Sequence, residues 1–205
     1  YPPFTAAYFD ETGRYAFGRQ PEALLWALAR LAETLLPLTT HEGLKTRLET
    51  FLPAFKQQLT TRTLALLGLC PADEQTDKAQ DSVTGLYTAL RETQAPFAQS
   101  LFDLFGGGNA ARLAKSPQAA LYQTAAMEKV IAELRTLPPH PLYASAQSHA
   151  YFALPRPTDL LIDEVEALWA PIADKDDWGP FEAHIAAIRL KGDAYAPLLP
   201  EPQTA

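Results

Sequence analysis

The residues best suited to chemistry lie in an irregular segment near the amino terminus. Asp10, Arg14, Tyr15, Arg19 and Gln20 follow one another closely in this segment. An arginine guanidinium binds phosphate oxygens with planar, multi-donor geometry, so Arg14 and Arg19 could hold a phosphate group. The alternative is that Arg14 pairs with Asp10 and anchors the loop on the helices that follow. The residues taken alone favour this second, structural interpretation.

The other reactive side chains form no catalytic or metal-binding pattern. The four histidines, His41, His140, His149 and His184, lie far apart and form no HxxxH or HExxH pair, so we expect them to be surface or packed residues. Cys70 is the only cysteine and has no histidine nearby in sequence, so we expect an inert thiol. We therefore assign no catalytic residue and no metal ligand, and expect no cofactor bound by this chain alone.

Acidic pairs and a glycine run have structural explanations. The pairs at 73–74, 163–164 and 176–177 lie at predicted helix starts or on polar faces, where the helix dipole or water stabilises negative charge. The three glycines at 106–108 follow a predicted helix, whereas a phosphate loop follows a strand and carries Lys-Ser or Lys-Thr. The glycine run therefore predicts the end of a helix.

Composition describes an acidic globular chain. Its 205 residues are 47% hydrophobic with a net charge of −7, so we expect neither nucleic acid nor membrane as a partner. The longest apolar stretches fall far short of the roughly 20 residues that span a bilayer. The single cysteine and the lack of a secretory signal predict a cytoplasmic protein. Because the first residue is not methionine, we expect the chain to begin inside a longer product or after processing.

The spacing of apolar residues predicts an all-α fold in two parts. An irregular loop segment over 1–20 precedes a helical carboxy-terminal domain over 21–205, a multi-helix bundle. Few windows show the two-residue alternation of a strand. The predicted helices lie at 21–36, 40–67, 80–105, 116–134, 158–170 and 179–190.

Several residues predict where these helices begin, break or end. Thr39 and Glu42 form a predicted capping box. Pro53 is expected to kink or divide the second helix, and Gly68 to end it. Pro96 predicts a further break in the third helix.

Two adjoining stretches carry a family resemblance. Residues 9–21 match the pattern S-D-x-x-G-R-Y-x-[FY]-x-x-Q-P, and residues 26–38 follow with a pattern like W-N-L-x-x-L-A-x-x-L-x-P-L. Both patterns are typical of the SelO family of pseudokinases. This chain departs from them in Phe9, where the family has serine, and in Ala27, where it has asparagine. Looser similarity continues at 66–69, 96–104, 154–157 and 177–181.

The resemblance implies a specific chemistry. SelO proteins have a protein-kinase-like fold, bind ATP in a flipped orientation with Mg or Mn, and transfer AMP to Ser, Thr or Tyr of target proteins. The family's glycine-rich loop, ATP-binding lysine and metal-binding aspartate lie upstream of the G-R-Y motif and have no counterpart in this chain. No catalytic residue is therefore carried over, and the chain alone should be inactive.

The leading hypothesis is the helical carboxy-terminal region of a SelO-like adenylyltransferase. Its partners would be the missing kinase-like region, in cis or in trans, and protein substrates. Arg14, Tyr15 and Gln20 are then the candidates for the edge of the active site. The alternative hypothesis is a stand-alone, non-catalytic helical interaction module left by truncation or gene splitting. An unrelated helical enzyme that shares the G-R-Y segment by chance is a third possibility.

Overall fold

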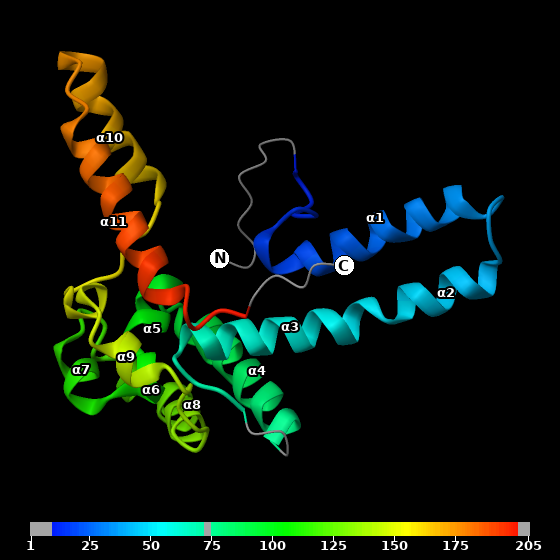
Figure 1. Cartoon of the computed structure of the whole chain (residues 1–205), viewed down its shortest axis with the longest axis horizontal. Helices are drawn as coiled ribbons and strands as arrows, with labels where there is room; N and C mark the ends of the chain where they lie inside the picture. Colours follow the sequence, from blue (N-terminus) through cyan, green and yellow to red (C-terminus); the bar gives the residue numbers. More distant parts are fainter. Residues whose placement is uncertain (1–9, 72–74, 201–205) are drawn as a thin grey trace. The chain divides into compact units, whose positions relative to one another are not determined.

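The computed structural model describes residues 10–71 and 75–200, and Figure 1 traces their helices. Within these residues the backbone forms helices, turns and loops with no strand, and its one isolated β-bridge pairs Leu69 with Pro139. The predicted all-α class is confirmed. The chain divides into two compact units, residues 1–60 and 61–205. The predicted domain boundary at residue 20 stays a prediction.

The first unit contains a short turn and two helices. Its elements are the 3-10 turn η1 (Phe17–Arg19), helix α1 (Gln20–Leu35) and helix α2 (His41–Glu49). Helix α3 (Phe51–Leu66) begins in this unit and continues past Thr60 into the second. Pro21 occupies the first turn of α1, where its missing N–H leaves no carbonyl unpaired. Of the described residues before Thr60, only Ala16 and Ala32 are fully buried hydrophobics. Many apolar side chains of this unit are therefore exposed.

The predicted cap of α2 is wrong by one residue, and the predicted division near Pro53 is confirmed. Thr40, not Thr39, caps α2, because its backbone is extended and its hydroxyl accepts the N–H of Gly43 at 3.2 Å. The helix predicted over 40–67 is divided in two as expected, with the break at Thr50, three residues before Pro53. Pro53 has no N–H to donate to the carbonyl of Glu49, the last residue of α2, and it lies in the first turn of α3, where a missing N–H is tolerated.

The second unit contains the remaining helices. They are α4 (Thr76–Thr93), α5 (Phe97–Asp103), α6 (Phe105–Gly108), α7 (Ala110–Lys115), η3 (Leu121–Gln123), α8 (Ala125–Leu134), α9 (Tyr143–Gln147), η4 (Ala150–Ala153), α10 (Ile162–Lys175) and α11 (Gly179–Tyr195). Helix α4 packs along α8, and α10 lies against α11. The predicted stop at Gly68 and the break near Pro96 are confirmed.

The predicted helix starts at 80 and 116 differ from the structure. Helix α4 begins at Thr76, four residues early. Helix α8 begins only at Ala125, because residues 116–120 form a turn in which the hydroxyl of Ser116 accepts the N–H of Gln118 at 3.0 Å. The connection predicted over 137–157 contains the short helices α9 and η4.

Two clusters of buried side chains form the interior of the second unit. An aliphatic cluster gathers around α4 and α8 and includes Leu64, Leu67, Leu86, Leu90, Leu104, Met127 and Leu134. An aromatic cluster joins α6, η4 and α11 through Phe105, Phe152 and Tyr195. The rings of Phe105 and Phe152 stack with centroids 3.9 Å apart, and Tyr195 meets both edge-on. Burial raises the pKa of neighbouring Tyr151 to about 12, so this phenol stays neutral at physiological pH.

A buried carboxylate links α5 to the turn before α8. Asp103, only 2% exposed, accepts hydrogen bonds from Gln99 Nε2 at 2.9 Å, Ser116 Oγ at 2.5 Å and Tyr122 Oη at 2.8 Å. A buried carboxylate is tolerated only when its lone pairs are satisfied in this way. Burial and the hydrogen bond to Asp103 raise the pKa of Tyr122 well above its ordinary value, which keeps its hydroxyl a donor.

Replacing this carboxylate should destabilise the second unit. Asp103→Ala removes the acceptor of two buried donors, Gln99 and Tyr122, and of the half-buried Ser116 hydroxyl. It should cost about 3 kcal/mol in the free energy of unfolding, measured by urea titration. Asp103→Asn keeps one carbonyl acceptor and should cost less. Asp81→Ala, an exposed carboxylate on α4, is the control and should change stability by less than about 0.5 kcal/mol. Equal losses in Asp103→Ala and Asp81→Ala would refute the structural role.

Gly106 is required by its conformation and by its neighbour. Its φ of +77° lies in the left-handed region, and a Cβ at this position would collide with the ring and hydroxyl of Tyr143. Its N–H also donates to the carbonyl of Leu67 at 2.8 Å. Together with Gly107 and Gly108, which also have positive φ, it ends the helical segment as predicted.

A pair of alanine substitutions separates this constraint from helix propensity. Gly106→Ala should lower the free energy of unfolding by at least about 2 kcal/mol, because strain and overlap add. Gly192→Ala, inside α11 with open space around the new methyl group, should instead raise it by about 0.5–1 kcal/mol. Urea unfolding measures both, and a neutral Gly106→Ala variant would contradict the close approach of Tyr143.

Candidate functional site

The amino-terminal segment folds as a tight turn around one carboxylate. Asp10 accepts the backbone N–H groups of Arg14 at 2.8 Å and Tyr15 at 2.7 Å, and the hydroxyl of Thr12 at 3.3 Å. Gly13 allows the turn through its φ of +66°. Desolvation raises the pKa of Asp10, but the hydrogen bonds from the two backbone N–H groups more than offset this. The pKa of Asp10 therefore lies below its ordinary value. Asp10 therefore organises the backbone that carries Arg14 and Tyr15.

Arg14 lies over an aromatic ring of α1. Its guanidinium carbon is 5.7 Å from the ring centroid of Trp26, and that of Arg30 is 5.9 Å from the same ring. A guanidinium over an indole face is attracted by the ring quadrupole. The arginine also lies close enough to Asp10 to lower the pKa of that carboxyl. These contacts support the structural interpretation, in which Arg14 anchors the loop.

The other arginine of the segment is held at the start of α1. Arg19 pairs with Glu22 at 3.1 Å and donates to the carbonyl of Thr12 at 3.5 Å. Both contacts are local and solvent-exposed, so they contribute little to stability. Tyr15 is exposed on the turn, and Gln20 is the exposed first residue of α1. The assignment of Arg14, Tyr15 and Gln20 to the edge of an active site stays a prediction.

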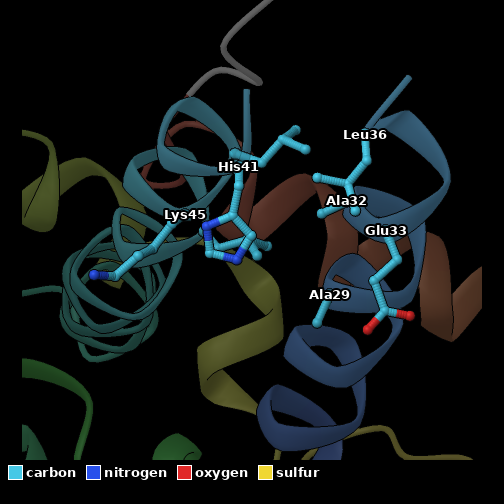
Figure 2. Close-up of a pocket in the computed structure, with 8 residues that line it drawn as sticks. Ala29, Ala32, Glu33, Leu36, His41 and Lys45 are labelled. Atoms are coloured by element: carbon cyan, nitrogen blue, oxygen red, sulfur yellow. The ribbon is translucent and has the colours of Figure 1, made fainter. Parts of the chain in front are cut away.

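A shallow cavity lies between α1 and α2 of the first unit. It has a volume of about 200 Å³. Figure 2 shows Ala29, Ala32 and Leu36 of the α1 side across from His41 of α2, while the side chain of Lys45 extends away from them. Aliphatic side chains dominate the lining, and Glu33 is engaged by Arg30 at 2.6 Å. The cavity offers no convergent set of polar groups, so it indicates a packing groove instead of a catalytic centre.

The residues that could bind a metal do not gather. Among residues 10–71 and 75–200, no group of three or more His, Cys, Asp or Glu side chains is placed to hold a metal ion. His140 and His149 accept the N–H groups of Leu142 and Tyr151 through Nδ1, which are local capping contacts. Cys70 donates to the carbonyl of Pro71 at 3.5 Å.

In the described part of the chain, no helix is long and apolar enough to cross a membrane.

Sequence reasoning missed one polar centre, the network around Asp103. The network is structural, because the carboxylate of Asp103 is buried and its oxygens already accept hydrogen bonds from protein side chains. The signal was present, since Asp103 interrupts the apolar run from Leu101 to Phe105. A carboxylate inside such a run needs buried donors, but nothing in the sequence names them.

The family model described as protein adenylyltransferase SelO matches residues 1–189, and the chain belongs to this family. The resemblance noted in the sequence is confirmed.

Curated relatives agree with this assignment. The protein nucleotidyltransferase YdiU of Rhodopseudomonas palustris strain TIE-1 is 29% identical over 91% of this chain and 39% of its own length. The YdiU proteins of Myxococcus xanthus and Shewanella putrefaciens are 34% and 37% identical over 48% and 47% of this chain. The matches span only 20% and 21% of those two relatives, so the chain corresponds to a minor part of each. No solved structure matches the chain.

The pKa of Asp10 gives a test of the turn. Its carboxylate stabilises the turn fully above the ordinary pKa of 3.8, and this contribution is lost as the pH falls through the lowered value. In an NMR titration, the amide signals of Arg14 and Tyr15 should report an apparent pKa below 3.8. Asp10→Asn should abolish this titration. An apparent pKa above 3.8, or an unchanged titration in Asp10→Asn, would contradict the hydrogen bonds.

Proposed function

We propose that these 205 residues are the helical carboxy-terminal region of a protein adenylyltransferase. The enzyme would transfer AMP from ATP to Ser, Thr or Tyr hydroxyls of target proteins and release pyrophosphate. The observation that carries the proposal is the SelO family match over residues 1–189. The family is one of protein adenylyltransferases, and its relatives are named protein nucleotidyltransferases, so both names refer to nucleotidyl transfer.

In this proposal ATP and Mg or Mn bind in a kinase-like region that acts with this chain in cis or in trans. The chain itself supplies a scaffold, and alone it is inactive. Nucleotidyl transfer needs groups that position the polyphosphate and neutralise its charge. Arg14, held above Trp26 by the turn at Asp10, is the residue of this chain best suited to contribute positive charge at the edge of that site. The cytoplasm is the proposed compartment.

Helix α1 offers a surface for the kinase-like region. Leu24 and Leu31 are seven residues apart, so both lie on one helical face, and they are 52% and 54% exposed. Exposed leucines at this spacing are typical of a helix that packs against another body. The same surface fits the alternative, a stand-alone interaction module, and the two hypotheses differ in whether AMP transfer follows from binding.

A chimera tests the proposal. In the Rhodopseudomonas palustris relative, the segment that aligns with this chain is replaced by the chain itself, and AMP transfer from α-labelled ATP to protein is measured. We expect activity within about tenfold of the intact relative, because a scaffold that packs correctly leaves the barrier nearly unchanged. The relative without this segment should lose most of its activity, and the 205-residue chain alone should transfer none.

Matched variants test the role of α1 in the chimera. Leu24→Asp with Leu31→Asp should lower transfer by at least about tenfold, since two charges would be buried at the contact. Leu38→Asp, an equally apolar and 82% exposed position after α1, is the control and should leave transfer unchanged. A folded chimera without activity would refute the scaffold role. AMP transfer by the chain alone would refute its dependence on a kinase-like region.

A further inference from the structure

A second cavity lies within the second unit, between α7 and α8. Its volume of about 300 Å³ is at the lower end of the range for small-molecule sites. The apolar part of its lining comes from Leu113, Ile131 and four alanines, and Gln123, Glu128 and Arg135 add polar groups. Apolar walls with a few polar groups are typical of a ligand site, and the groove between α1 and α2 lacks this combination.

The two charged residues of the lining have opposite signs and are well separated. Glu128 and Arg135 are seven residues apart, so they lie on one side of α8 about 10 Å from each other along its axis. Within residues 10–71 and 75–200 neither residue takes part in an ion pair, with each other or with a third group. The cavity therefore carries one unneutralised negative charge and one unneutralised positive charge.

The guanidinium of Arg135 is already oriented. Its Nη2 donates to the carbonyl of Gly108 at 2.6 Å, at the end of the glycine run. This hydrogen bond uses one of the five guanidinium donors and leaves others for a carboxylate. Glu128 lies in the first turn of α8, and its carboxylate accepts no hydrogen bond from a described residue. Both groups are thus available to a ligand.

No other charged side chain lines this cavity. The remaining charges of α7 and α8 are Arg112, Lys115, Lys129 and Glu133, and all four lie outside the lining. Arg112 instead lies over the ring of Phe102, with its guanidinium carbon 4.1 Å from the ring centroid. The electrostatic character of the cavity is therefore set by its own acid and its own base.

We infer that this cavity binds a short peptide of about three residues with free ends. Three extended residues span about 10 Å, which matches the separation of the two charges. The peptide's ammonium group would pair with Glu128 and its carboxylate with Arg135, while an apolar side chain packs on Leu113 and Ile131. A ligand with a single sign of charge would meet repulsion at one end, so the cavity selects a zwitterion. The inference does not depend on AMP transfer.

A binding titration tests the cavity directly. The probe is the tripeptide alanyl-leucyl-alanine, added to the full 205-residue chain and followed by the amide NMR signals of α8. We expect a dissociation constant of about 0.1 mM, as is typical for a ligand of this size, and weaker binding at about 0.5 M salt. The amino-acetylated peptide and the carboxy-amidated peptide should each bind at least about tenfold more weakly, since each loses one charged hydrogen bond. Free leucine is too short to reach both charges and should also bind at least about tenfold more weakly.

Variants of the chain assign each charge to its partner. Glu128→Gln should weaken binding of the free tripeptide about tenfold and leave binding of the acetylated peptide unchanged, because that contact is already missing. Arg135→Gln should act in the same way on the free and amidated peptides. Because Arg135→Gln also removes the hydrogen bond to Gly108, its folding is checked by circular dichroism, and the amidated peptide tests the same charge on the unaltered chain.

Matched controls lie on the same helix. Glu133→Gln and Lys129→Gln remove one acid and one base of α8 outside the lining, and both variants should bind the tripeptide like the parent chain. An equal loss of binding in the controls would reduce the effect to general surface charge and overturn the inference. So would equal binding of the acetylated or amidated peptide, or no shift of the α8 signals at about 5 mM tripeptide. Free leucine that binds as tightly as the tripeptide would overturn the assigned ligand length.

Discussion

The close approach of Tyr143 to two glycines is the constraint on which the second unit depends. Gly68 and Gly106 both have positive φ, and a Cβ at either would overlap the Tyr143 ring. Two hydrogen bonds hold the crossing, from Gly106 N–H to Leu67 and from His140 N–H to Gly68. The crossing brings together the end of α3, the glycine run and the start of α9. Leu67 and Leu104 beside this crossing belong to the aliphatic cluster, and Phe105 belongs to the aromatic cluster, so the crossing joins the two clusters.

The sequence predicted the elements whose cause is local and missed those whose cause is distant. Gly68 and the glycines at 106–108 end helices through their own backbone freedom, so the sequence alone located both ends. The Ser116-Pro117 pair looks like a helix start, but the Ser116 hydroxyl donates to Asp103, 13 residues away. That contact depends on the packing of α5 against the turn, which is a tertiary contact. A local pattern cannot reveal it, and the helix starts at Ala125 instead.

The candidate site shows the same division. The turn at Asp10 follows from a short acid-glycine pattern, since the carboxylate reaches N–H groups four and five residues on. The contact of Arg14 with Trp26 joins residues 12 positions apart, and only the helical direction of α1 places that ring near the turn. Sequence reasoning offered Asp10 as the partner of Arg14, whereas the structure gives the arginine an aromatic partner as well. The phosphate-binding hypothesis therefore starts from an arginine that is already positioned.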